Sequence, residues 1–213
     1  MIRLEQVYLK YIKEFYTLYD INLELKENTL IFGDIFDGTH SLFRLISKID
    51  RDYEGDIFID DKNLKDIKDK DLSLSYVTDF PYLFERKNIY KNLYYPLKIR
   101  KIDKITAKNM INDAINQYNL NNFPQKIKDM TLAQKKIIAL IRAVIRGPKY
   151  ILLEDFFSTL DKEYFDIAID ILSSSNSTII ACEKMDIDIN FFNSFKKLAL
   201  SYGKIENIKT NNK

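Results

Sequence analysis

The sequence predicts an α/β domain with a largely parallel β-sheet, and three observations lead to this prediction. Short apolar runs typical of strands alternate along the chain with segments whose apolar residues fall at helical spacing. The 213 residues are enough for one large domain with a subdomain. Hydrophobic residues make up 46% and charged residues 30%, a balance typical of a folded globular protein rather than a disordered one.

The N-terminal part combines two kinds of strand. Residues 2–8 and 19–25 alternate between apolar and polar side chains, which is typical of half-buried strands. Residues 29–32 form an uninterrupted apolar run, which is typical of a strand covered on both faces. A loop bounded by Gly33 and Gly38 follows, and a helical pattern begins directly after it. The predicted order is therefore strand, loop, helix.

The middle of the chain predicts two more strands and then a helical lobe. Residues 55–60 alternate, and residues 74–77 form another short strand. From residue 88 to residue 130 the apolar side chains fall at helical spacing, with Pro96 and Pro124 as expected breaks.

The C-terminal part repeats the alternation of amphipathic helices and buried strands. Gly147 and Pro148 stop the first of these helices, and the acidic pair Glu154 and Asp155 ends the next strand. In chain order we expect a helix over residues 133–146, a strand over 150–153, a helix over 163–172, a strand over 178–182 and a hairpin over 198–205.

Charge and hydropathy limit the classes of partner. The formal net charge is only +2, which gives no global electrostatic argument for nucleic acid, so we expect no nucleic-acid partner. No stretch approaches the roughly 18 apolar residues needed to cross a bilayer, and no basic segment followed by a long apolar one opens the chain. The single cysteine, Cys182, has no disulfide partner. We therefore expect a cytoplasmic protein that meets a membrane only through a partner.

The loop from Gly33 to Gly38 has the form Gly-x-x-x-x-Gly and connects a buried strand to a helix. P-loop proteins hold phosphates with backbone amides at such a place. Two glycines at this spacing also arise often by chance, so the loop alone leaves an ordinary strand-to-helix turn equally open.

The rest of the chain carries a more specific resemblance. Five blocks resemble, in order, motifs of the ATP-binding subunits of ABC transporters: residues 33–46 the Walker A segment, 53–62 the strand pair after it, 76–84 the Q-loop region, 131–149 the signature motif with its helix, and 151–161 Walker B with the D-loop. The resemblance runs from about residue 2 to residue 206.

This resemblance implies a P-loop NTPase-like ABC ATPase core with a mostly parallel sheet, an N-terminal antiparallel β subdomain and an inserted helical lobe. We expect a single domain over residues 1–213, in which residues 1–79 and 130–213 form the core with the β subdomain and residues 80–129 form the lobe.

The resemblance also implies ATP and Mg²⁺ as ligands and assigns roles by position. Asp155 occupies the position of the catalytic glutamate and Glu183 that of the switch histidine. Metal-binding positions are Ser41, Asp79 and Glu154. Nucleotide-binding positions are Tyr11, where the family places an aromatic that stacks on adenine, and Gly33, Asp37, Gly38, Thr39, His40 and Ser41.

Several of these positions carry residues that the family does not use. Thr39 and His40 stand where the family has the phosphate-binding lysine and the magnesium-binding hydroxyl. Glu154 and Asp155 reverse the usual Asp-Glu order, which makes the catalytic base one methylene shorter; a shift of this size costs roughly a hundredfold where geometry is demanding. For Asp155, an acid with a purely structural role is equally open.

The signature glycines are also replaced, by Leu132 and Ala133, and the Q-loop glutamine by Asp79. Because these changes occur together while apolar core positions keep their type, the pattern predicts a retained fold with weak or lost ATP hydrolysis.

Three functions remain open from the sequence. The first is an ATP-binding-cassette subunit that docks on a membrane permease, with a second such subunit as homo- or heterodimer partner. In the second, the chain is an active ATPase in which Ser41 and Glu154 hold magnesium and Asp155 orients water. The third is a scaffold or regulator without a role in transport.

Overall fold

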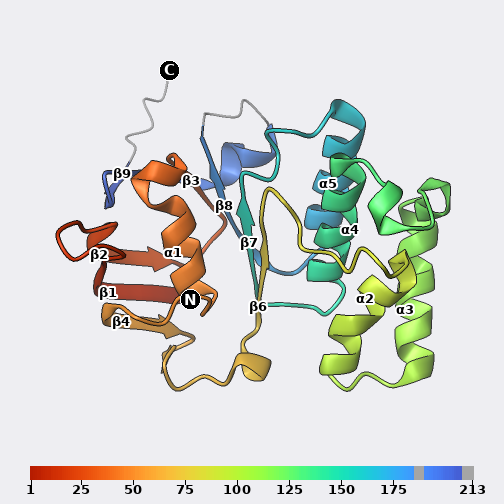
Figure 1. The fold of residues 1–213 in the computed structure, drawn as a ribbon, viewed down its shortest axis with the longest axis horizontal. Helices are drawn as coiled ribbons and strands as arrows, with labels where there is room; N and C mark the ends of the chain where they lie inside the picture. The colour runs from red at the N-terminus through yellow and green to blue at the C-terminus, as the bar shows by residue number, and fades with distance from the viewer. Residues whose placement is uncertain (185–189, 208–213) are drawn as a thin grey trace.

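The computed structural model describes residues 1–184 and 190–207 and has an α/β fold (Figure 1). Its N-terminal sheet is antiparallel, and neighbouring strands follow the order β2-β1-β4-β5. β1 (Ile2–Leu9) lies between β2 (Leu18–Leu25) and β4 (Glu54–Ile59), and the short β5 (Lys62–Asn63) pairs with β4. The alternating pattern of β1 and β2 buries every apolar side chain that points to one face of this sheet.

The second sheet is parallel except at one edge. Its strands follow the order β10-β9-β3-β8-β7-β6, and only the pair of β9 and β10 is antiparallel. The strands are β3 (Thr29–Phe32), β6 (Leu74–Val77), β7 (Tyr150–Glu154), β8 (Thr178–Glu183), β9 (Lys196–Ser201) and β10 (Lys204–Asn207). The carboxyl ends of β3, β7 and β8 therefore meet at one edge of the sheet, the place where open parallel sheets bind ligands.

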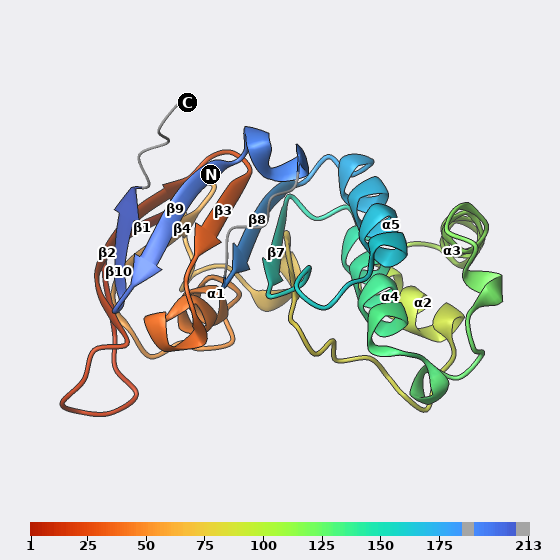
Figure 2. The same cartoon turned by 90° about the horizontal axis from the view of Figure 1, so that it is seen from above.

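The helices lie on two sides of this sheet. Figures 1 and 2 show α1 (Thr39–Ile46) between the two sheets, whereas α4 (Leu132–Val144) and α5 (Lys162–Ser173) cover the opposite face of the parallel one. Farther out lie α2 (Ile89–Ile99) and α3 (Lys104–Gln117). A capping box fixes the start of α4, because Thr131 and Gln134 exchange side-chain and backbone hydrogen bonds.

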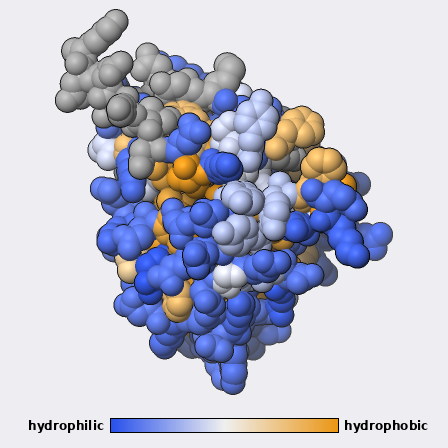
Figure 3. Space-filling model, turned by 90° about the vertical axis from the view of Figure 1, so that its left-hand side faces the viewer, coloured by the Kyte–Doolittle hydropathy of each residue, from blue (hydrophilic) through white to orange (hydrophobic). Residues whose placement is uncertain are grey.

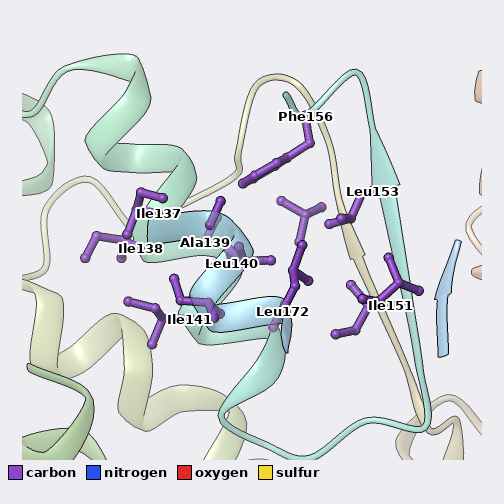
Figure 4. Close-up of a cluster of buried hydrophobic side chains, with 14 of the residues drawn as sticks. Ile137, Ile138, Ala139, Leu140, Ile141, Ile151, Leu153, Phe156 and Leu172 are labelled. Carbon is purple, nitrogen blue, oxygen red and sulfur yellow. The ribbon is translucent and has the colours of Figure 1, made fainter. Parts of the chain in front are cut away.

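Two hydrophobic cores share the parallel sheet, and β7 shows how its residues are divided between them. Ile151 and Leu153 join the core that contains α4 and α5 (Figure 4). Tyr150 and Leu152 join the core formed with α1 and the antiparallel sheet. Because successive side chains of a strand point to opposite faces, a continuous apolar run is what a sheet covered on both sides requires.

The predicted strands and helices are all present, with ends that differ by one or two residues. The expected break at Pro96 is wrong: this proline lies inside α2, although it cannot donate the backbone bond to the preceding turn. Periodicity did not predict β5, because two residues are too few for a periodic signal; only the resemblance indicated a strand pair near residues 53–62. Cys182 is buried, as its apolar neighbours indicate.

The proposed division into a core and a lobe over residues 80–129 stays a prediction, and residues 185–189 and 208–213 of the proposed core lie outside the described part. No helix in the described ranges is long and apolar enough to span a bilayer. The face on the side of the antiparallel sheet is mainly hydrophilic, with hydrophobic side chains scattered among the polar ones (Figure 3).

Candidate functional site

The loop between β3 and α1 contains a short 3₁₀ turn, Ile35–Asp37, and two glycines that the packing requires. Gly38 has a φ of 98°, and a Cβ there would lie 2.7 Å from the carbonyl oxygen of Thr17. A Cβ on Gly33 would lie 2.6 Å from the carbonyl oxygen of Leu200. Both distances are too short for any side chain, so the loop backbone is pressed against its neighbours on both sides.

At the position of the Walker A lysine, the side chain of Thr39 turns inward. It is buried, and its hydroxyl donates to the carbonyl oxygen of Asp34 at 3.1 Å. The start of α1 has no side-chain cap. First-turn amides of a helix lack intrahelical partners, and the helix dipole favours an anion near them. The loop thus keeps amides that suit a phosphate but lacks the positive charge that a lysine adds.

Asp37 is bound to the protein's own backbone. Its carboxylate accepts the amide of Asp34 at 3.0 Å and the amide of Tyr202 at 3.1 Å, and its carbonyl oxygen accepts the amide of Gly203 at 3.0 Å. These bonds tie the loop to the turn between β9 and β10. By contrast, the neighbouring Phe36 is 92% exposed. The Asp37 carboxylate thus occupies backbone amides of the protein itself, including one of the loop.

His40 and Glu154, to which the resemblance assigns nucleotide binding and metal binding, contact each other directly. The Nδ1 atom of His40 lies 2.6 Å from Oε1 of Glu154, and the hydroxyl of Tyr76 donates to Oε2 of the same carboxylate. Glu154 is nearly completely buried at the end of β7. Burial, followed by the contact with Glu154, raises the pKa of Tyr76, so this phenol stays a hydrogen-bond donor.

The residues predicted to bind metal do not fit Mg²⁺ in this arrangement. Magnesium requires oxygen ligands in near-octahedral geometry. Both carboxylate oxygens of Glu154 already have partners, the imidazole of His40 and the hydroxyl of Tyr76. Asp79 pairs with the ammonium of Lys136 at 2.5 Å. Ser41 is buried and follows His40 in the sequence. Within the described ranges, no group of three or more His, Cys, Asp and Glu side chains could hold a metal ion.

Asp155 lies on a strained backbone just after β7. Its φ is 44°, a conformation that costs a residue with a Cβ roughly 1–2 kcal/mol, and its amide donates to the carbonyl oxygen of Cys182 at 2.9 Å. The carboxylate lies 3.6 Å from the ammonium of Lys184. Burial raises the pKa of Asp155, and the charge of Lys184 opposes this shift. Such strain is common at functional sites.

Glu183 is a buried carboxyl at the end of β8. One oxygen accepts the amide of Phe157 at 2.9 Å, whereas the other has no hydrogen-bond partner in the described structure. Burial raises the pKa of Glu183 to about 7, because desolvation disfavours the charged form. The switch-histidine position thus carries a group that titrates near neutral pH.

This raised pKa predicts a pH-dependent stability. The folded protein holds the Glu183 proton more tightly than the unfolded chain, whose carboxyl has the ordinary pKa of 4.5. The stabilising contribution is therefore complete below about pH 4.5 and is lost as the pH rises through about 7, by on the order of 3 kcal/mol. We expect Glu183→Gln, which stays neutral, to be more stable than the wild type at pH 8 and equal to it near pH 4.

Denaturant unfolding of both proteins between pH 4 and pH 8 measures this difference. Glu163→Gln, at an exposed position of α5, serves as the control and should change stability equally at every pH. If Glu183→Gln shows no dependence on pH relative to the wild type, the buried carboxyl does not titrate as described.

Tyr11 lies beside the far end of α1. Its side chain is 56% exposed, and its hydroxyl donates to Asp50. Asp50 also receives two hydrogen bonds from Arg44, at 2.9 and 2.6 Å, and this carboxylate raises the pKa of the Arg44 guanidinium. The ring of Tyr11 is therefore partly exposed to solvent, and its hydroxyl is held by the ion pair of Asp50 and Arg44.

Lys136 is the residue of the site that sequence reasoning missed. Its side chain is completely buried, and its ammonium contacts Asp79, the backbone after β7 and Thr159. The signal was present, because Lys136 lies between apolar residues on the buried face of a predicted amphipathic helix. A charge on such a face requires a partner.

Solved structures of similar fold include ATP-binding cassettes. The ATP-binding cassette MJ0796, in a dimeric post-hydrolysis state bound to ADP and Pi, aligns with a TM-score of 0.81 and 19% identity over 98% of this chain and 99% of that one. The cbiO1 protein of Clostridium perfringens, part of the transporter complex cbiONQ, aligns with a TM-score of 0.79 and 19% identity over 96% of this chain and 86% of that one. These matches confirm the predicted fold class.

Sequence comparison agrees with the fold. The oligosaccharides import ATP-binding protein MsmX of Bacillus subtilis (strain 168) is 27% identical over 163 residues, which are 75% of this chain and 45% of that protein. The chain thus spans less than half the length of this curated relative. The model of the ABC transporter family matches residues 18–158, well over half of the chain. Fold, motif order and this match together place the chain in the ABC transporter family.

Proposed function

We propose that the chain is the ATP-binding-cassette subunit of a membrane transporter, that it docks on a permease, and that its ATP hydrolysis is weak or lost. The observation that carries the proposal is the contact of 2.6 Å between Nδ1 of His40 and Oε1 of Glu154, because it engages two positions that the resemblance assigns to nucleotide and metal binding. Thr39 also supports weak or lost hydrolysis, because a threonine at the lysine position supplies no positive charge to a terminal phosphate.

A groove of about 600 Å³ supports the proposed docking. Aromatic side chains of Tyr82, Phe84 and Tyr95 line it together with Arg142 and Arg146 of the α4 region. An amphipathic helix of a partner commonly binds by laying its apolar face into a groove of this kind.

The two arginines indicate what kind of segment the groove accepts. Arg142 donates to the carbonyl oxygen of Tyr82 at 2.6 Å, and Arg146 donates to the hydroxyl of Ser75 at 3.0 Å. Neither guanidinium has an ion-pair partner in the described part of the chain, and burial lowers the pKa of both. Because both guanidinium groups are half-buried and have no ion-pair partner among the described residues, a permease segment with a carboxylate side chain would stabilise the groove when it binds.

We therefore expect Arg142→Glu to weaken association with the permease by roughly tenfold or more, since it replaces attraction for a carboxylate by repulsion. The fraction of the protein that sediments with membranes of its native cell, at several protein concentrations, measures this association. Lys108→Glu makes a similar charge change at an exposed position of α3 and should leave the fraction unchanged. Equal losses in both variants would count against the groove.

Titration calorimetry of the purified chain tests the nucleotide part of the proposal. With ATP and magnesium we expect a dissociation constant of roughly millimolar or weaker, because the lysine and the metal position are missing. Omitting magnesium should change the affinity little. Micromolar binding that requires magnesium would contradict the proposal and would favour the active ATPase, in which Asp155→Asn abolishes turnover.

The relatives suggest further features of the proposed role. MsmX is named as an import protein and cbiO1 as part of a transporter complex, which favours an importer. MJ0796 is described as dimeric, which favours a second ATP-binding-cassette subunit as homo- or heterodimer partner. Through the permease, the chain would lie at the inner face of the cell membrane. Dimerisation without nucleotide, and without any permease, would instead favour a scaffold.

A further inference from the structure

We propose that Lys136 is a positioning residue, whose buried ammonium group holds the Q-loop position Asp79 and the backbone that presents Asp155 together as one unit, whether or not nucleotide is bound. The proposal goes beyond the transport role. It concerns how the site is held together, and it stands whether the chain hydrolyses ATP or not.

The ammonium of Lys136 connects three separate parts of the chain. Lys136 lies on α4, and its ammonium donates to the carboxylate of Asp79, which follows β6, at 2.5 Å. It also donates to the hydroxyl of Thr159, which follows β7, at 2.7 Å. It also contacts the carbonyl oxygens of Asp155 at 3.1 Å and Phe156 at 2.9 Å. An ammonium has three protons, so these four acceptors saturate it.

Burial makes these contacts hard to break. The Lys136 side chain is 0% exposed, whereas that of Asp79 is 32% exposed. A buried charge left without its partner costs about 3–5 kcal/mol, more than most single contacts contribute. If Asp79 moved away alone, the buried ammonium would lose its carboxylate partner, and if the segment after β7 moved away alone, it would lose three of its four acceptors.

Lys136 also stabilises the strained turn that carries Asp155. The Asp155 amide is held by the carbonyl oxygen of Cys182 at 2.9 Å, and its carbonyl oxygen is held by Lys136. With both ends of the residue fixed, its φ of 44° is maintained by tertiary contacts rather than by its own preference. The direction of the Asp155 carboxylate thus depends on a residue that does not touch it.

The charge of Lys136 reaches the second candidate catalytic position as well. Glu183 accepts the amide of Phe157, the residue that follows the Phe156 carbonyl bound by Lys136. The positive charge of Lys136 lowers the pKa of Glu183, against the larger effect of burial and against the charge of Asp155. Removing this charge should therefore raise that pKa further.

Hydrogen exchange of the full chain tests the proposed unit, with Lys136→Met compared against Lys135→Met. The neighbouring Lys135 pairs with Glu85 at 3.2 Å outside the buried cluster, so its loss removes one lysine without touching the unit. In Lys136→Met we expect amides of residues 78–84 and of residues 155–160 to exchange roughly tenfold faster or more, both together. Magnesium ATP should not restore protection, and Lys135→Met should match the wild type in both segments.

A spectroscopic readout separates positioning from a general loss of stability. In carbon-13 NMR titrations of the Glu183 carboxyl, Lys136→Met should move the midpoint above the wild-type value of about 7, and Lys135→Met should not. If Lys136→Met does not fold, Asp79→Asn keeps the lysine and should loosen the same two segments by a smaller factor. Faster exchange in only one segment, uniform loss of protection, or an unmoved Glu183 midpoint would overturn the proposal.

Discussion

A double substitution, Thr39→Lys with His40→Ser, should raise the affinity for magnesium ATP by roughly ten- to a hundredfold. The lysine restores a charge-assisted hydrogen bond to a terminal phosphate, worth about 1.5–3 kcal/mol, and each 1.4 kcal/mol is a factor of ten. The serine removes the imidazole that lies 2.6 Å from Glu154 and places a hydroxyl at the magnesium position. Calorimetry with and without magnesium measures both effects, because only the repaired site should depend on the metal.

The single variants and a matched control show what the gain depends on. Thr39→Lys alone should improve binding without making it depend on magnesium, since Glu154 stays paired with His40. Thr106→Lys introduces the same lysine at an exposed position in the first turn of α3 and should leave ATP affinity unchanged. If the double variant folds but gains nothing, the backbone of the loop, tied by Asp37 to Tyr202, limits binding instead of the missing charge.

The sequence predicted strands and helices well, because their signal is local. Residues 150–153 read as a buried strand from four apolar side chains in a row, and the structure places these side chains alternately in the two cores. The break expected at Pro96 failed for a related reason: a local rule about proline was outweighed by the burial of Leu93 and Leu97 on the same helix.

The sequence predicted which residues belong to the candidate site, but it did not predict which of them contact one another. The motif order assigned His40, Asp79 and Glu154 to the site, but no spacing rule relates His40 to Glu154, which are 114 residues apart, or Asp79 to Lys136, which are 57 apart. These pairs form only when the carboxyl ends of β3, β6 and β7 lie close together and α4 packs against the sheet. The buried Lys136 was the one local clue.

The Phe156→Ala substitution should cost about 3–5 kcal/mol of unfolding free energy. Phe156 is completely buried and packs against the core around α4 (Figure 4), with its ring 5.1 Å from that of Phe157 and the ammonium of Lys136 5.7 Å from its centre. Truncation leaves a cavity beside a buried charge, and that cavity adds to the lost burial of apolar surface.

The chain offers a control with the same chemical change. Phe36 is 92% exposed, so Phe36→Ala removes an equal number of atoms at almost no cost in burial and should change the free energy of unfolding by less than about 0.5 kcal/mol. Chemical denaturation of both variants at one pH gives the comparison. Similar losses would mean that Phe36 is covered in solution, and a small loss in Phe156→Ala would mean that the core around the Lys136 cluster can collapse into the space. The predicted contrast follows because burial, rather than residue type, sets the cost of losing a phenyl ring.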